Sequence, residues 1–282
     1  MDLYMWEWSA TPLIIFHEGD FLESHQSLVR SFTWRRAVSF AYVNWTQFPT
    51  GFNPETYQEK WDYPHKGPHK WGYNQMIRFW VTRIWHHPAI RGYTALVRLD
   101  SDSCLTKPFS GFYLPRGSNY LSWRASYECG PYSNGEAEFA EKYLKDQRLE
   151  VADPVEWERR GAEVGCVPAF YNNFEVTRVA FFQREDVAKF QLAITDTEPY
   201  GVFGWRWGDA AIRWFTLTLF SPPGTVTVDR YMRYFYSHTC DPFHLFEIVG
   251  LVLALALTAL VMLLPIKPRW RHKILVCTRC SH

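Results

Sequence analysis

An apolar run in the middle of the chain, residues 92–99, stops abruptly at Asp100-Ser101-Asp102. Its β-branched and aromatic residues are typical of a buried strand. Carboxylates that follow such a strand are expected at the edge of an α/β sheet where ligands bind. Near the N-terminus, residues 11–17 also read as a buried strand, and residues 22–32 have the spacing of a helix. A strand, a polar turn and a helix in this order predict an α/β fold.

Further elements follow along the chain. Helices are predicted at residues 75–86, 137–149, 186–194 and 207–219, a strand at 174–182, and a long loop at 46–73. The chain of 282 residues has no internal repeat and no low-complexity linker. We therefore predict one catalytic domain, residues 1–244.

The segment from 248 to 264 has seventeen apolar or neutral residues and no charge, which is the short end of a membrane span. Trp270 and four basic residues follow, as expected where a helix leaves the hydrocarbon. We predict a transmembrane helix at 245–266 and an unstructured basic tail at 267–282; a buried core helix is the weaker alternative. No signal peptide is visible before it.

The composition and the missing motifs exclude some classes of protein function. A net charge of +1, with acidic and basic residues well mixed, gives no electrostatic footprint for nucleic acid. GxSxG, Walker, GxGxxG and HExxH motifs are absent, which removes several common enzyme classes. Aromatic residues make up 18% of the chain, which suits sugar binding but suits a core of large residues better.

Several side chains are candidates for chemistry. Asp100 and Asp102 have the spacing to hold a hard divalent cation that also binds a diphosphate, although a solvated turn explains them equally well. Glu175 follows an amide-rich turn and could act on a sugar carbon as nucleophile, base or stabilising charge. Asp209 could do likewise or could only cap a helix. His238 is a potential metal ligand in an aromatic segment.

Taken in order, five motifs resemble glycosyltransferase family 15, the fungal α-1,2-mannosyltransferases. They span most of the globular chain. The motifs are Gly72-Tyr73-Asn74-Gln75-Met76-Ile77-Arg78-Phe79, Arg98-Leu99-Asp100-Ser101-Asp102, Tyr171-Asn172-Asn173-Phe174-Glu175, Tyr200 with Arg206-Trp207-Gly208-Asp209-Ala210, and Tyr236-Ser237-His238 with Cys240 and Pro242.

The resemblance implies a GT-A fold and transfer of mannose from GDP-mannose to a mannoside acceptor with retention of configuration. It implies Mn²⁺ as the cofactor and gives each matching residue a role. Those residues are Asp100, Asp102 and His238 as metal ligands, Tyr73, Arg78, Asp102, Arg206 and Asp209 as donor- or substrate-binding groups, and Glu175 as the catalytic nucleophile.

Three other functions stay open at this stage: a glycosyltransferase that uses a UDP-sugar, a glycoside hydrolase that uses Glu175 and Asp209, and a non-catalytic sugar-binding membrane protein. We expect a membrane protein of the Golgi or endoplasmic reticulum, with the side that its domain faces undecided. The sequon Asn44-Trp45-Thr46 would be glycosylated only in the lumen. The pairing of the six cysteines cannot be read from their spacing.

Overall fold

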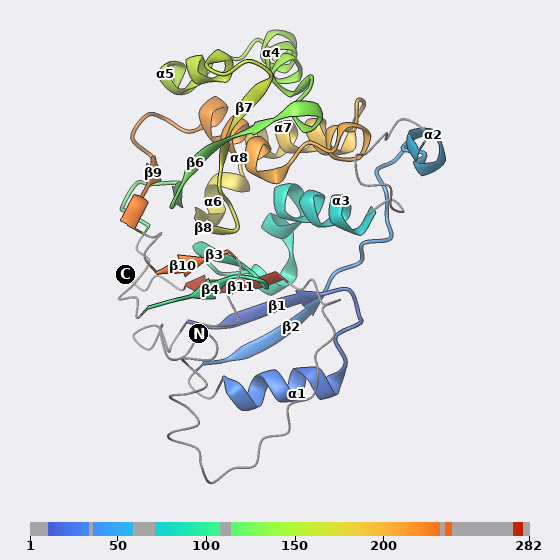
Figure 1. Cartoon of the computed structure of the whole chain (residues 1–282), viewed down its shortest axis with the longest axis vertical. Helices are drawn as coiled ribbons and strands as arrows, with labels where there is room; N and C mark the ends of the chain where they lie inside the picture. Colours follow the sequence, from blue (N-terminus) through green and yellow to red (C-terminus); the bar gives the residue numbers. More distant parts are fainter. Residues whose placement is uncertain are drawn as a thin grey trace.

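The computed structural model describes residues 11–33, 36–58, 71–107, 114–231 and 235–238, together with the backbone of residues 273–278. Its centre is a seven-stranded mixed sheet with the order β2-β1-β11-β3-β8-β5-β9 (Figure 1). The strands are β1 (Leu13–His17), β2 (Val38–Tyr42), β3 (Ala95–Asp100), β5 (Tyr120–Ser122), β8 (Phe174–Arg178), β9 (Val226–Val228) and β11 (Lys273–Thr278). The predicted α/β class is confirmed.

Two small sheets lie beside the central one. β6 (Ala125–Cys129) pairs with β7 (Cys166–Phe170), and β4 (Cys104–Leu105) pairs with β10 (Tyr236–Ser237), both antiparallel. These pairings bring distant parts of the sequence to the end of β3.

Helices cover the sheet. They are α1 (Glu23–Phe32), α2 (Pro54–Gln58), α3 (Trp71–Arg78), α4 (Glu136–Gln147), α5 (Pro154–Trp157), α6 (Val179–Phe182), α7 (Glu185–Asp196) and α8 (Asp209–Phe220). In Figure 1, α1 lies on one side of β1 and β2, whereas α3, α7 and α8 lie on the other. The helix that begins at α3 continues as a π-helical turn, Phe79–Arg83, and a 3₁₀ turn, Ile84–His86.

The central strands are buried on both faces, and their alternation divides the core in two. Ile14 and Leu96 belong to the large cluster under the helices, while Leu13 and Val97 belong to a smaller cluster on the opposite face. Every residue of β3 is buried. Because side chains alternate, Arg98 lies on the same face as Leu96 and faces the helices.

Most predicted elements are present, with three differences. The predicted loop at 46–73 contains the short helix α2 and the first residues of α3. The run at 174–182 is strand only as far as Arg178 and then turns into the short helix α6. The predicted helix at 22–32 exists as α1, but none of its residues is buried, and Phe32 is 70% exposed. The amphipathic spacing therefore predicted the helix correctly but not a buried face.

The predicted span at 245–266 lies outside the described residues. Among the residues that the structure does describe, no helix is both long and apolar enough to cross a bilayer. Part of the tail at 267–282 is described, because residues 273–278 form β11 between β1 and β3. The expectation of an unstructured tail is therefore wrong for these six residues.

Candidate functional site

The segment Asp100-Ser101-Asp102 stands at the carboxyl end of β3, as predicted. Asp100 is 6% exposed, and both of its oxygens are in use. Oδ1 accepts a hydrogen bond from Arg98 Nε at 3.1 Å, and Oδ2 accepts one from Asn173 Nδ2 at 2.8 Å. The Asp102 side chain is 66% exposed. Of the two carboxylates, Asp102 is therefore the one that faces solvent.

His238 lies next to Asp102. The pairing of β10 with β4 carries it there, because Ser237 is opposite Cys104. His238 Nδ1 is 3.9 Å from Asp102 Oδ1, and the Tyr171 ring packs edge-on against the imidazole with centroids 5.7 Å apart. The structure thus brings together two of the three predicted metal ligands.

An arginine at the centre of the site links three carboxylates. Arg98 is 2% exposed and donates to Asp100 on its own strand and, through NH1, to Asp209 Oδ2 of α8 at 2.6 Å. Glu175 Oε1 on β8 is 3.9 Å from the same NH1. Burial disfavours the charge, but Asp209, Asp100 and Glu175 together raise the pKa of Arg98 above its usual range. Arg98 is a fixed cation under the site.

Glu175, the predicted nucleophile, lies in the interior and is 1% exposed. Its oxygens accept from Arg213 of α8, with Nε 3.2 Å from Oε2 and NH2 3.1 Å from Oε1. This fork-to-fork pair fixes the carboxylate in one orientation. The structure therefore gives Glu175 a structural partner that the sequence did not reveal, and its catalytic role stays a prediction.

Tyr73, Arg206 and Asp209 form the wall on the helix side. The Arg206 guanidinium lies over two rings, 4.9 Å from the centroid of Tyr73 and 4.3 Å from that of Tyr132. Arg206 has φ 60°, a left-handed conformation that is strained for a residue other than glycine and is common at functional sites. Burial, together with the charge of Asp209, raises the pKa of Tyr73 to about 12, so its hydroxyl stays protonated.

Two predicted site residues have protein partners that the sequence did not reveal. Asp209 is the first residue of α8, with Gly208 at the N-cap position, and its carboxylate binds Arg98 rather than capping the helix. Arg78 is 5% exposed and forms a salt bridge with Asp196, while its NH1 donates to the carbonyl of Gln47 at 2.8 Å. These contacts tie Arg78 to the packing of α3 against α7, and its predicted part in donor binding stays a prediction.

Sequence reasoning missed three charged residues near the site: Arg213, Glu128 and Glu136. Arg213 had a recognisable signal, because a single arginine in the otherwise apolar run of α8 requires a buried anion as its partner. Glu128 and Glu136 gave none. Burial, followed by the charge of Asp209 and opposed by Arg206, raises the pKa of Glu128 to about 7. Burial and the charge of Glu128 raise the pKa of Glu136 well above its usual range.

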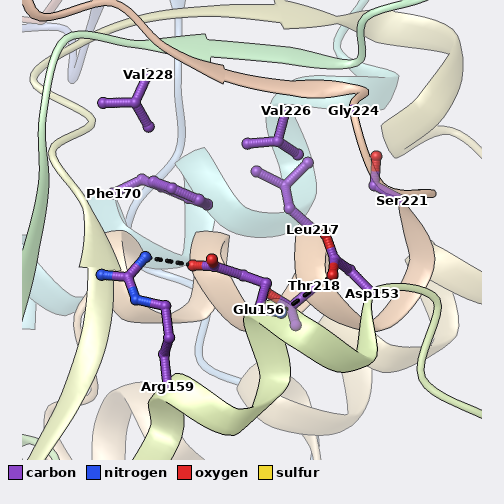
Figure 2. A pocket seen from close by; sticks show the side chains of 10 residues that line it. All are labelled: Asp153, Glu156, Arg159, Phe170, Leu217, Thr218, Ser221, Gly224, Val226 and Val228. Atoms are coloured by element: carbon purple, nitrogen blue, oxygen red, sulfur yellow. Dashed lines mark hydrogen bonds and ion pairs between the residues drawn. The ribbon is translucent and has the colours of Figure 1, made fainter. Parts of the chain in front are cut away.

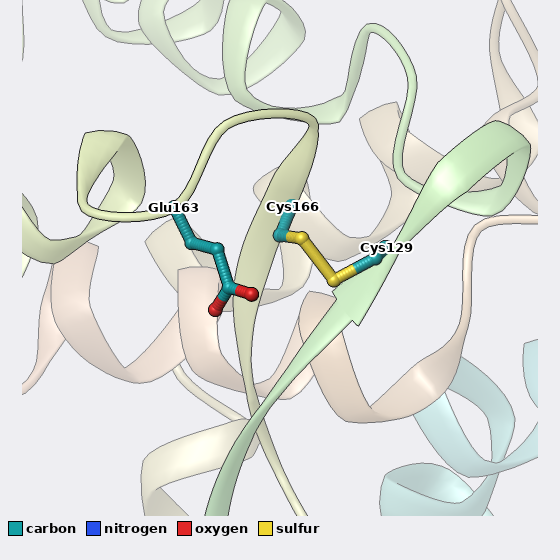
Figure 3. Close-up of side chains that lie close together, drawn as sticks. All are labelled: Cys129, Glu163 and Cys166. Carbon is teal, nitrogen blue, oxygen red and sulfur yellow. A yellow bond between two sulfur atoms is a disulfide. The ribbon is translucent and has the colours of Figure 1, made fainter.

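One group of three potential metal ligands lies within 4.8 Å in the described part of the chain, and it is not the predicted one. It consists of Cys129, Glu163 and Cys166 (Figure 3). Cys129 and Cys166 form a disulfide that joins β6 to β7, so their sulfurs are not thiolates and do not make a metal site. Cys104 is disulfide-bonded as well.

A cavity of about 130 Å³ lies between α5, α8, β7 and β9 (Figure 2). No predicted site residue lines it. Glu156 at its edge accepts from Arg159 NH1 and from Trp214 Nε1, both at 2.6 Å, and Asp153 caps α5. Its acidic groups thus already have structural partners.

No protein-family model matches this sequence, and no curated protein does either. Solved structures do match. Core-mannan synthase A (CmsA/Ktr4) from Aspergillus fumigatus, in a Mn/GDP form, superposes with a TM-score of 0.68 at 18% identity, covering 84% of this chain and 72% of that one. The S. cerevisiae mannosyltransferase Ktr4p gives 0.67 at 19% identity, covering 82% and 64%, and its complex with GDP gives 0.66 at 19%, covering 82% and 65%.

The chain is a mixed α/β protein whose central sheet presents a cluster of charged side chains at the end of β3. More particularly, its fold is that of the fungal mannosyltransferase structures. The chain spans a little under two thirds of the length of the yeast protein.

Proposed function

We propose that the protein is a metal-dependent, retaining glycosyltransferase that transfers mannose from GDP-mannose to a mannoside acceptor. The observation that carries the proposal is the pairing of Asp102 with His238 at the end of β3, in a fold shared with mannosyltransferases, one of them solved in a Mn/GDP form. An α-1,2 linkage rests on the motif resemblance alone.

The residues present fit a divalent cation. Asp102 supplies an exposed carboxylate and His238 an imidazole, both within reach of one ion, and the diphosphate would complete the coordination. When bound, such a metal takes up negative charge as the diphosphate leaves. Asp100 is expected to orient the turn between these ligands through its bonds to Arg98 and Asn173.

The remaining groups hold the substrate and its charge. Arg98 is a preorganised cation in a buried site, where electrostatic stabilisation is strongest. Tyr73 keeps its proton and can donate a hydrogen bond, and Arg206 presents a cation held between two rings. Glu175 is the proposed nucleophile. To act in this way, its carboxylate must be released from Arg213 when the substrate binds.

The hydrolase alternative is less well supported. A glycosidase needs one carboxyl that keeps its proton to act as general acid. Glu175 and Asp209 are instead both engaged as hydrogen-bond acceptors, Glu175 by Arg213 and Asp209 by Arg98. A UDP-sugar donor and a non-catalytic sugar-binding role remain outcomes of the test below.

The test combines binding and turnover. GDP with Mn²⁺ should raise the melting temperature of the wild-type protein, and GDP-mannose should be consumed with methyl α-mannoside as acceptor. Asp102→Asn and His238→Ala should each remove the Mn²⁺-dependent part of both signals, whereas Asp146→Asn, a surface change on α4, should not. Stabilisation by UDP but not by GDP would indicate that the donor is a UDP-sugar and not GDP-mannose. Turnover that survives in chelator would overturn the metal assignment.

We also propose that the domain resides in the lumen of the Golgi or endoplasmic reticulum, anchored by the segment at 245–266. The Cys129–Cys166 disulfide supports an oxidising compartment. In the sequon, Asn44 Oδ1 accepts from the Thr46 amide at 2.9 Å and from Thr46 Oγ1 at 2.7 Å. A glycosidase-sensitive mobility shift that Asn44→Gln abolishes is expected. Digestion of the domain by protease added to sealed microsomes would contradict the lumenal placement.

A further inference from the structure

Glu128 lies beside the candidate site on a rigid support. It is on β6, opposite Val167 of β7, and the next residue, Cys129, is bonded to Cys166 (Figure 3). Its carboxylate packs against Gly208, where a Cβ would come within 2.6 and 2.7 Å of the two oxygens. Because Gly208 directly precedes Asp209, this contact places Glu128 at the wall formed by Tyr73, Arg206 and Asp209.

One carboxylate oxygen of Glu128 is buried without a hydrogen-bond donor. Within the described residues, its buried Oε2 has no hydrogen-bond partner, and neither oxygen of Glu136, which is fully buried at the start of α4, has one. A buried acceptor without a donor carries its whole desolvation cost. Departures of this kind from a well-satisfied interior are concentrated at functional sites. A ligand that donates hydrogen bonds would satisfy Glu128.

Position and charge indicate which ligand this is. Glu128 lies against Gly208 at the start of α8, whereas the proposed metal ligands Asp102 and His238 lie beside β4 and β10. A carboxylate would also repel a diphosphate but accepts readily from a neutral hydroxyl. Tyr73 and Tyr132, on either side of Arg206, offer ring faces of the kind that pack against sugars.

We propose that Glu128 is an acceptor-binding residue that takes a hydrogen bond from a hydroxyl group of the acceptor sugar. This inference rests on the proposed function, because it assigns the acceptor side of that same site. Glu136, fully buried at the start of α4 with a pKa that burial and the charge of Glu128 raise, does not touch the ligand.

Ionisation of Glu128 gives the proposal a pH signature. Four titratable or charged groups face it: Asp209 of α8, Arg206 before α8, Glu136 of α4 and Tyr73 of α3. Burial first and Asp209 second raise its pKa to about 7, and Arg206 opposes them. Only the carboxylate is a pure acceptor. Acceptor affinity should therefore fall as the pH drops below about 7.

The experiment compares Glu128→Gln with the matched variant Glu136→Gln, using GDP-mannose and methyl α-mannoside between about pH 6 and pH 8.5. Loss of a hydrogen bond to a charged group predicts a rise of about tenfold or more in acceptor KM for Glu128→Gln above pH 7. Its donor KM should stay within about twofold, and its acceptor KM should no longer rise near pH 7. Glu136→Gln should keep the wild-type acceptor KM and pH profile.

Three results would overturn the assignment. Glu128→Gln could change the donor KM and the acceptor KM equally, Glu136→Gln could raise the acceptor KM as much as Glu128→Gln does, or the acceptor KM of Glu128→Gln could still rise as the pH falls through 7. If the wild-type protein transfers no sugar, the proposed function fails separately. The site is then tested by the thermal shift that methyl α-mannoside alone produces. A shift that is lost in Glu128→Gln supports the site, whereas no shift in the wild-type protein, or an equal shift in both, refutes it.

Discussion

The buried pair between Glu175 and Arg213 allows stability to be separated from chemistry. Both side chains are 1% exposed, two hydrogen bonds join them, and Arg213 NH2 also donates to the Trp80 carbonyl at 3.2 Å. Removing one partner of such a pair leaves an uncompensated buried charge, at a cost of about 3–5 kcal/mol. In a domain of this size, that corresponds to a fall in melting temperature of about 6–20 °C. Glu175→Met and Arg213→Met should each show it.

The double variant Glu175→Met with Arg213→Met completes the cycle. Replacing both charges by apolar groups of similar volume is often neutral, so most of the stability should return. Urea unfolding of the four proteins gives the coupling energy, which we expect to exceed about 2 kcal/mol. A Glu175→Met variant as stable as the wild type, or a double variant as unstable as the two single losses combined, would refute this reasoning. Transfer by a stable double variant would show that Glu175 is not the nucleophile.

Three further predictions concern β6 and its neighbours. Replacing Cys129 and Cys166 by serine opens a loop of 37 residues in sequence separation and should lower the free energy of unfolding by about 4 kcal/mol, measured in urea; an unchanged midpoint would contradict it. Gly208→Ala should cost about 1–3 kcal/mol, because the added Cβ meets Glu128, and Glu128→Ala in the same chain should relieve that cost if the contact is its cause. The pKa of Glu128 is raised from 4.5 to about 7, so between these values the folded protein holds a proton that the unfolded chain releases. The protonated Glu128 therefore contributes its full stabilisation below about pH 4.5, and this stabilisation is lost as the pH rises through 7. Relative to Glu128→Gln, the wild-type protein should lose about 3 kcal/mol between pH 4.5 and pH 8, and a constant difference between the two would count against the raised pKa.

The sequence was most informative where hydrophobic periodicity and chemistry coincide. The apolar run before Asp100 became β3, and the run after Gly208 became α8, because both segments are buried over nearly their whole length. The run at 174–182 was assigned as a single strand because periodicity cannot separate a short buried strand from a short buried helix. Tertiary contacts decide there: the Arg178 amide donates to Asn119, and the Val179 amide to Thr94.

The candidate site was predictable in its residues but not in their pairing. Asp102 and His238 approach each other only because β4 and β10, two residues each, happen to pair, and strands so short leave no periodic signal. Arg213 and Glu175 are on different elements, and nothing local to either residue identifies the other. The motif resemblance predicts which residues carry the chemistry, whereas the ion pairs depend on packing between the sheet and α8.

The hydrogen bonds that hold Asp100 have a consequence for how metal and nucleotide affect each other's binding. Asp100 is held by Arg98 and Asn173, so the two predicted ligands with exposed side chains are Asp102 and His238. A divalent ion held by two side chains needs further oxygen ligands to be bound tightly, and a diphosphate supplies them. By linkage, each of the two ligands then strengthens the binding of the other by the same factor. Under the proposed function, the affinity for Mn²⁺ measured without nucleotide should therefore understate the affinity with nucleotide bound.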